Sequence, residues 1–153
     1  MAEYLANAVQ TVNLNEAAIF TASIPCNLGL VYHEDETGVF LLRGIANNCG
    51  CPTRYQVTFN GNIAIPTGGT VGPIAVALTV NGEIRPTSRA IVNPTAVETY
   101  DDVTSTAIIT VPRGCCFSLS LRAVSGITPP DTSTPAPAIL LQNANLVINR
   151  VRG

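Results

Sequence analysis

Hydrophobic and polar residues alternate with a period of two along much of this 153-residue chain. In the stretch "RYQVTFN", Tyr55, Val57 and Phe59 fall on one face of an extended backbone. Gln56 and Thr58 fall on the other face, and this alternation is typical of a strand with one buried side. Helical periodicity is largely absent, and β-branched residues, Gly, Pro and Asn are frequent. The pattern therefore predicts an all-β chain divided into short strands by turns.

About ten strands at this spacing predict a two-sheet sandwich or a barrel. We treat residues 1–153 as a single domain, because a chain of this length buries a sufficient core without further units. Residues 1–9 are expected to form an N-terminal arm, in which residues 3–9 are the only weak helical candidate. The expected strands are residues 10–14, 17–22, 29–33, 38–43, 54–65, 74–80, 89–93, 103–111, 116–124 and 139–151.

Turn chemistry divides these strands. Asn-Gly pairs predict tight turns in "VNGE" (residues 80–83) and "FNGN" (residues 59–62). Gly114 is expected to occupy a turn position with positive φ. The Gly- and Pro-rich residues 65–73 predict a loop, and "SGITPPDTSTPAPA" (residues 125–138) predicts an exposed loop that is too rich in Pro and Thr to join a sheet.

Composition indicates self-association. Charged residues make up 12% of the chain, hydrophobic residues 46%, and the mean hydropathy is +0.31. This charged share is about half that of an ordinary soluble domain, so we expect copies of the chain to cover part of its surface. The stretch "IAVALTV" (residues 74–80) is apolar on both faces, which predicts that a neighbouring subunit covers one of them. The expected interface residues, there and on the last strand, are Ile74, Ala75, Ala77, Thr79, Leu146 and Ile148.

The order of "RYQVTFNG", "VALTVNGE", "STAIITVPRGCCFSLSL" and "NANLVINRV" resembles the jelly roll shared by tumour necrosis factor (TNF) and the globular heads of complement proteins. The chain is also similar to small proteins of spore-forming anaerobes and their phages, and to the C-terminal domains of collagen-like spore-surface glycoproteins. The resemblance implies a ten-stranded TNF-like jelly roll, with the C-terminal strand in the middle of the inner sheet, that packs as a homotrimer about the edge of that sheet. The chain departs from the pattern in its five cysteines, its Pro-rich loop and its lack of a Gly-X-Y stalk.

The five cysteines admit several interpretations. An odd number leaves at least one thiol free or bonded to another chain. Cys115 and Cys116 are neighbours, and adjacent residues seldom bond to each other. In a strand they would face opposite sides, one thiol inside and the other outside. The candidate interchain cysteines are Cys26, Cys49, Cys51, Cys115 and Cys116. Reduced thiols remain the simplest alternative, and the spacings do not match a zinc site.

Few residues are candidates for chemistry. His33, the sole histidine, lies in "YHEDETG" beside Glu34, Asp35 and Glu36, a cluster with cation-binding groups that more simply forms a solvated turn. Loop carboxylates at residues 101–102 admit a calcium site, although carboxylates that only interact with water are commoner. No nucleophile elbow, phosphate loop or dinucleotide fingerprint occurs. We therefore expect no catalytic residue, no metal, no cofactor and no enzymatic activity.

Charge and segment patterns restrict the partners and the location. All eight basic residues are arginines, scattered along a chain of net charge −2, so no basic stripe predicts nucleic-acid binding. No apolar run reaches membrane-spanning length, and the N-terminus lacks a signal-peptide pattern, so we expect synthesis in the cytoplasm and no membrane insertion.

Together these observations predict a non-enzymatic structural protein that self-assembles and is displayed on the exterior of a phage virion or a spore, beside other particle-surface proteins. One alternative is a trimeric carbohydrate- or receptor-binding head, which scarce aromatics (5%, no Trp) disfavour. Another is a subunit of a disulfide-linked extracellular fibre.

Overall fold

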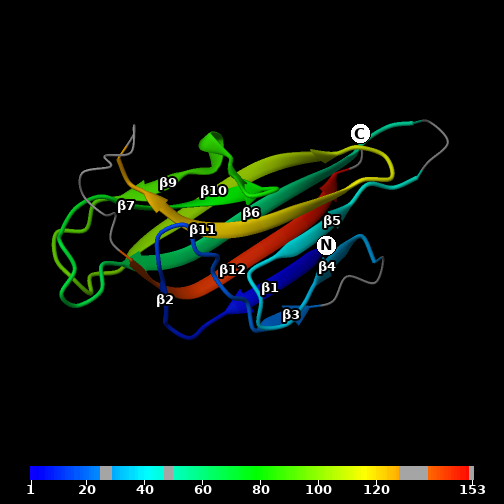
Figure 1. The fold of residues 1–153 in the computed structure, drawn as a ribbon. Coiled ribbons are helices and arrows are strands. Elements are labelled where there is room, and N and C mark those ends of the chain that lie inside the picture. The colour runs from blue at the N-terminus through cyan, green and yellow to red at the C-terminus, as the bar shows by residue number, and fades with distance from the viewer. Residues whose placement is uncertain (25–28, 47–49, 128–137, 152–153) are drawn as a thin grey trace.

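The computed structural model describes residues 1–24, 29–46, 50–127 and 138–151, which form two antiparallel six-stranded sheets packed face to face (Figure 1). One 3₁₀ turn, η1 (Pro86–Ser88), interrupts the strands. The strands are β1 (Ala2–Ala6), β2 (Gln10–Val12), β3 (Ala22–Ile24), β4 (Val31–His33), β5 (Phe40–Arg43), β6 (Thr53–Ala64), β7 (Ile74–Val80), β8 (Glu83–Ile84), β9 (Ala90–Val92), β10 (Asp101–Val111), β11 (Cys116–Ser125) and β12 (Ile139–Val151).

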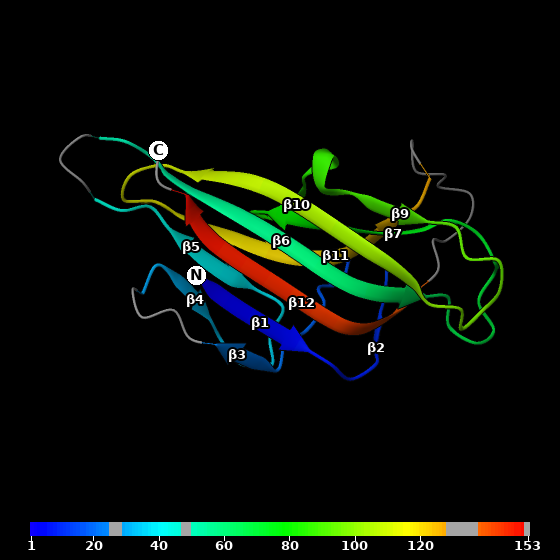
Figure 2. The same ribbon diagram turned by 180° about the vertical axis from the view of Figure 1, so that it is seen from behind.

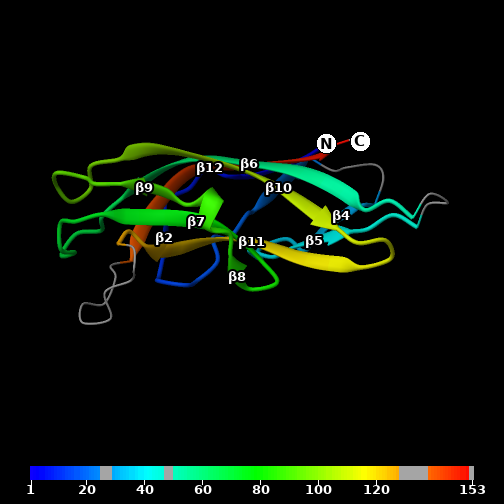
Figure 3. The same cartoon turned by 90° about the horizontal axis from the view of Figure 1, so that it is seen from above.

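The inner sheet has the order β10-β6-β12-β1-β3, with β2 also paired to β12. The outer sheet has the order β4-β5-β11-β7-β8, with β9 also paired to β7. Figure 3 shows the two layers edge-on, with β10, β6 and β12 in one and β11, β7 and β5 in the other. The C-terminal strand thus lies inside the inner sheet, between β6 and β1, as the resemblance implies.

The core lies between the sheets because each long strand alternates buried and exposed residues. Tyr55, Val57 and Phe59 of β6 are at most 1% exposed, which confirms the face predicted for them. Tyr4 and Phe40 meet across the core with their ring centroids 4.6 Å apart. Removal of these apolar faces from water is the main stabilising contribution, at roughly 25 cal/mol per Å² of buried surface.

The described residues form twelve strands, where the sequence pattern predicts about ten for the whole chain. The N-terminal residues, expected as an arm with a weak helical candidate, contribute β1, which lies between β12 and β3. Ala2, Tyr4 and Ala6 are buried while Glu3 and Leu5 are half-buried, so the period is two. Residues with good helix propensity are strand residues here because pairing on both sides outweighs a weak local preference.

The strand expected at residues 17–22 is displaced, since β3 begins only at Ala22. Ala18 and Phe20 are buried, but their backbone N–H groups donate to Leu121 and Thr37 respectively. The backbone of Ile19 exchanges two hydrogen bonds with the side chain of Gln10. Side chains here alternate between buried and exposed although the backbone forms no hydrogen-bonded ladder with a single neighbouring strand. The hydrophobic pattern cannot distinguish this arrangement from a true strand.

Two predicted turns have different outcomes. Asn81 and Gly82 both have positive φ, at 52° and 83°, and connect β7 to β8 as the Asn-Gly signal predicts. The turn predicted at residues 59–62 is wrong, because this segment continues through β6. A Cβ on Gly61 would lie 2.8 Å from Cζ of Phe59, so the glycine here makes room for an aromatic ring.

Two further expectations concern the Pro-rich loop and membrane insertion. The loop expected at residues 125–138 lies mostly outside the described residues. No helix in the described part of the chain has the length and apolar character needed to cross a membrane.

Candidate functional site

The outward side of the inner sheet is formed mainly by β6, β10 and β12, the three longest strands of the described residues. Figure 2 shows β10, β6 and β12 side by side across it, with β1 next to β12. We call this surface the long-strand face. Its side chains are Asp102, Thr104, Thr106, Ile108 and Thr110 of β10, Arg54, Gln56, Thr58, Asn60 and Asn62 of β6, Asn143, Asn145, Val147 and Asn149 of β12, and Glu3 and Leu5 of β1.

Strand register arranges these side chains in rows across the sheet. One row joins Thr106, Thr58, Val147 and Glu3, because each residue is the direct partner of the next. The hydroxyl groups of Thr58 and Thr106 are 3.2 Å apart and hydrogen-bonded. In cross-strand positions such contacts stabilise the sheet and hold the side chains in fixed directions.

Further polar pairs connect neighbouring positions of the face. The Thr104 hydroxyl donates to Oδ1 of Asn60 at 2.8 Å, and Nδ2 of Asn145 donates to the Glu3 carboxylate at 2.6 Å. The middle of the face is therefore neutral or internally paired. Arg54 and Asp102, the exposed charges on this face, lie near its two ends.

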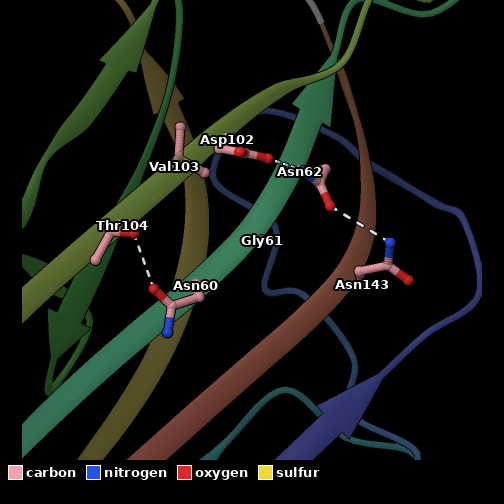
Figure 4. Close-up of a pocket in the computed structure, with 7 residues that line it drawn as sticks. All are labelled: Asn60, Gly61, Asn62, Asp102, Val103, Thr104 and Asn143. Carbon is pink, nitrogen blue, oxygen red and sulfur yellow. Dashed lines mark hydrogen bonds between the residues drawn. The ribbon is translucent and has the colours of Figure 1, made fainter.

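A shallow hollow of about 270 Å³ lies at one end of the long-strand face (Figure 4). Gly61 lies between its walls, and the Asn62 amide donates to the Asp102 carboxylate, while Asn143 donates to Oδ1 of Asn62 at 3.4 Å. Asn143 has a φ of 52° at a register shift in β12 between Gln142 and Asn145. This irregularity places one more amide side chain at the hollow, whose chemistry is that of amides, a hydroxyl and one carboxylate.

The exposed edge of the inner sheet is partly capped. Nη2 of Arg85 donates to the Ile108 carbonyl at 3.2 Å. The Ser105 hydroxyl donates to the Ser88 carbonyl. Because an open strand edge invites further pairing, the Arg85 contact leaves one carbonyl of β10 less available for adding a strand.

The six residues predicted to form the interface are not on the surface. Each is at most 1% exposed in the single chain, as the values for Ile74, Ala75, Ala77, Thr79, Leu146 and Ile148 show.

Ile74, Leu146 and Ile148 belong to the core between the sheets. On the opposite side of β7, Ala75 and Ala77 form a small buried cluster with Val124. These side chains have no surface to offer a partner, so the surface available for assembly lies elsewhere. Apolarity on both faces of β7 correctly indicated burial, but the chain itself supplies that burial.

The side chain of Cys115 does not face the direction that the strand pattern predicts for it. Cys116 begins β11 on the outer side of its sheet, directly opposite Arg43. Cys115 belongs to the preceding turn and is also exposed, so neither thiol of the pair faces the core. Cys51 is exposed as well. Cys26 and Cys49 lie outside the described residues, and interchain pairing stays a prediction.

The acidic cluster around His33 forms the turn between β4 and β5, which agrees with the favoured interpretation of a solvated turn. Thr37 donates its N–H to the Glu34 carbonyl, and Glu36 has a φ of 64°. The His33 ring stacks on Phe40 at 4.4 Å, and Nε2 donates to the Thr37 carbonyl at 3.0 Å. Among the described residues no three His, Cys, Asp or Glu side chains are placed to hold a metal ion.

Asp101 and Asp102 lie at the start of β10 and not in a loop. The alternating pattern predicts that Gln56 and Thr58 face away from the core, but the pattern alone does not identify the long-strand face. The available signal was the neutrality of these outward residues, where Lys and Glu are the usual choice.

No protein-family model and no curated protein matches this sequence. Two solved structures cover nearly the whole chain. The globular domain of zebrafish complement 1qA has a TM-score of 0.56 at 12% identity, over 95% of this chain and 94% of that one. Eiger TNF from S. frugiperda has a TM-score of 0.62 at 10% identity, over 99% and 92%.

A β-glucosidase from Paenibacillus barengoltzii matches at a TM-score of 0.37, over 72% of this chain and 9% of that one, which is too low to support an argument. The two near-complete matches share the overall fold of the double sheet described above. The chain thus has the TNF-like jelly-roll fold found in TNF and in complement globular domains.

Proposed function

We propose that this protein is a non-enzymatic structural module that assembles into a homotrimer and is displayed on the exterior of a phage virion or a spore. Its fold is that of the complement 1qA globular domain and Eiger TNF. The resemblance to such proteins implies trimers about the edge of the inner sheet. The proposed role requires a stable scaffold and a self-complementary surface and requires no reactive group.

The observation that carries the proposal is the long-strand face. Its middle rows present hydroxyls, amides and the apolar side chains of Ile108 and Val147, with Ile108 49% exposed. Removing such side chains from water costs little free energy when a partner offers hydrogen bonds, whereas removing unpaired charges from water costs much more. A face of this kind, on a chain with only 12% charged residues, favours contact with another copy.

Mass measurement tests the assembly. Light scattering on the eluting protein is expected to give three times the 16.0 kDa of one chain. Ile108→Arg places a charge on the long-strand face and is expected to dissociate the trimer while leaving each subunit folded. The matched control is Ile91→Arg, because Ile91 is 48% exposed but lies on β9 of the other sheet.

A wild-type mass of one chain at micromolar concentration would exclude the proposed assembly. Equal dissociation by both variants would remove the assignment of the face. Display is tested separately by antibody labelling of intact phage particles and of spores. Absence of the protein from both surfaces would contradict that part of the proposal.

The hollow at the end of the long-strand face favours a second candidate, a carbohydrate- or receptor-binding head. Asn60, Asn62, Asp102 and Asn143 provide amide and carboxylate groups that hydrogen-bond sugar hydroxyls well. No aromatic residue lines the hollow, so the stacking platform that sugar sites favour is missing there. Glycan-array binding by wild type that Asn60→Ala abolishes would favour this candidate over a purely structural role.

A further inference from the structure

Two groups of charged residues lie at opposite ends of the sandwich. The β10–β11 turn marks the first end, which we call the arginine end. Arg113 lies in this turn, Arg43 is opposite Cys116, Arg54 is paired with Thr110 and Val151, and Arg150 is paired with Tyr55. All four arginines are exposed, and none of them forms an ion pair with another described residue.

The acidic end lies at the other extremity of the same strands. Asp101 and Asp102 begin β10, opposite Ile63 and Asn62 of β6. Glu98 precedes them, and its backbone N–H donates to the Ile65 carbonyl. The carboxylates of Glu98 and Asp102 accept hydrogen bonds from the neutral groups of Thr67 and Asn62, so their charge remains uncompensated.

The separation of the two ends prevents them from neutralising each other within one chain. Arg54 and Asn62 are eight residues apart in β6, which corresponds to roughly 26 Å along an extended strand. This exceeds the screening length of about 8 Å at physiological ionic strength. The molecule is therefore electrically polarised along its strands, despite a net charge of only −2.

We propose that the arginine end docks onto the acidic end of a second copy, so that copies stack head to tail along the strand direction. The four positive charges of one end and the three negative charges of the other are similar in number and opposite in sign. One contact between two copies therefore neutralises both surfaces. A polyanion would satisfy only the arginine end, and the net negative charge opposes its approach. Because the contact joins two different surfaces, it repeats and builds a column.

This contact does not depend on how many copies pack side by side. The long-strand face lies parallel to the strands, whereas the two charged surfaces lie at the strand ends (Figure 2). Lateral assembly therefore leaves Arg43, Arg113, Glu98 and Asp101 accessible, whereas Arg54 and Asp102 lie on the long-strand face itself. Cys115 lies in the same turn as Arg113 and Cys116 begins β11 directly after it, so the exposed thiol pair would lie inside each joint.

Sedimentation velocity and negative-stain electron microscopy test the columns, with the thiols kept reduced throughout. Wild type is expected to form columns at low salt that shorten about tenfold when the ionic strength rises above physiological values. Two double variants, Arg43→Glu with Arg113→Glu and Glu98→Arg with Asp101→Asn, bring one end each to zero net charge. Neither variant alone is expected to stack.

Mixing the two variants provides the decisive control. The unchanged acidic end of the first still complements the unchanged arginine end of the second, so the mixture is expected to form pairs that do not extend further. Pair formation also shows that both variants are folded. Asp35→Arg, in the β4–β5 turn away from both ends, is expected to stack like wild type.

Thiol labelling locates the joint. Maleimide modification of the peptide that contains Cys115 and Cys116 is expected to slow several-fold at low salt in wild type and to be insensitive to salt in the Arg43→Glu, Arg113→Glu variant. Trimers that do not stack at low salt would overturn this inference and leave the proposed function intact. Columns of single chains would instead support the inference and contradict the trimer. Retention on immobilised polyphosphate without self-association would assign the arginine end to an anionic polymer and overturn the inference.

Discussion

Gly114 sets the geometry of the turn that carries the thiol pair. Its φ is 70°, its N–H donates to the Gly44 carbonyl at 3.2 Å, and Cys115 donates to the Pro112 carbonyl at 3.1 Å. A Cβ at this position would meet no atom within 4 Å. Any cost of substitution therefore arises from backbone conformation and not from crowding.

Gly114→Val is expected to lower the free energy of unfolding by about 1–2 kcal/mol, because a β-branched residue is strained in the left-handed region. Gly114→Asn provides the matched comparison and is expected to lose less than half as much, since Asn tolerates this conformation. Chemical denaturation measures both. Equal stability of all three proteins would show that the turn relaxes to a negative φ.

At the scale of single elements, the sequence predicts best where alternation and pairing coincide. Residues 54–65 form a strand because their apolar positions face one core and their backbone pairs on both sides. Alternation fails for residues 17–20, where buried side chains occur without a common partner strand. It also misassigned the outer face of β7, because a hydrophobic pattern reports burial without identifying what provides it.

β1 is the element that local propensity missed, and Tyr4 is its anchor. Tyr4 is 4% exposed, and its ring centroid lies 4.6 Å from that of Phe40 and 5.0 Å from that of His33. Tyr4 therefore joins the inner sheet to β4 and β5 of the outer one.

Tyr4→Ala is expected to destabilise the fold by about 3–5 kcal/mol through lost burial and a residual cavity. Leu5→Ala, at the half-buried neighbouring position, is expected to cost clearly less. Thermal unfolding followed by circular dichroism compares the two variants. A similar loss from both would mean that β1 contributes as a backbone partner and not through its inward side chains.

At the scale of the whole molecule, the candidate site could be predicted only in part. Low charge content correctly directs attention to surface coverage, but the location of the exposed neutral face depends on the register among β10, β6, β12 and β1. Residues that share a row, such as Glu3 and Val147, are far apart in the sequence. Only the folded pairing reveals that they form one surface.

The thiol pair has two possible roles in the whole molecule, which are to stabilise one subunit and to link subunits covalently. Cys115 and Cys116 are exposed, so replacing both with Ser removes no core contact. The double variant is expected to unfold within about 0.5 kcal/mol of wild type, as surface substitutions usually do. A loss of several kcal/mol would instead show that the pair stabilises the subunit itself.

Cross-linking is then measured in a different experiment. An interchain disulfide needs one thiol from each of two chains, and the acidic end holds no described cysteine, so the stacking contact itself supplies no second thiol. The Cys115–Cys116 turns of copies that pack side by side must therefore approach each other, and oxidation by molecular oxygen then converts two of their thiols into an interchain disulfide. After such oxidation, wild type is expected to show a ladder of covalent multimers on a non-reducing gel, and the double Ser variant a markedly weaker one. A ladder of equal strength in both proteins would assign cross-linking to other cysteines, and its absence from wild type would leave the turn's thiols without an interchain role.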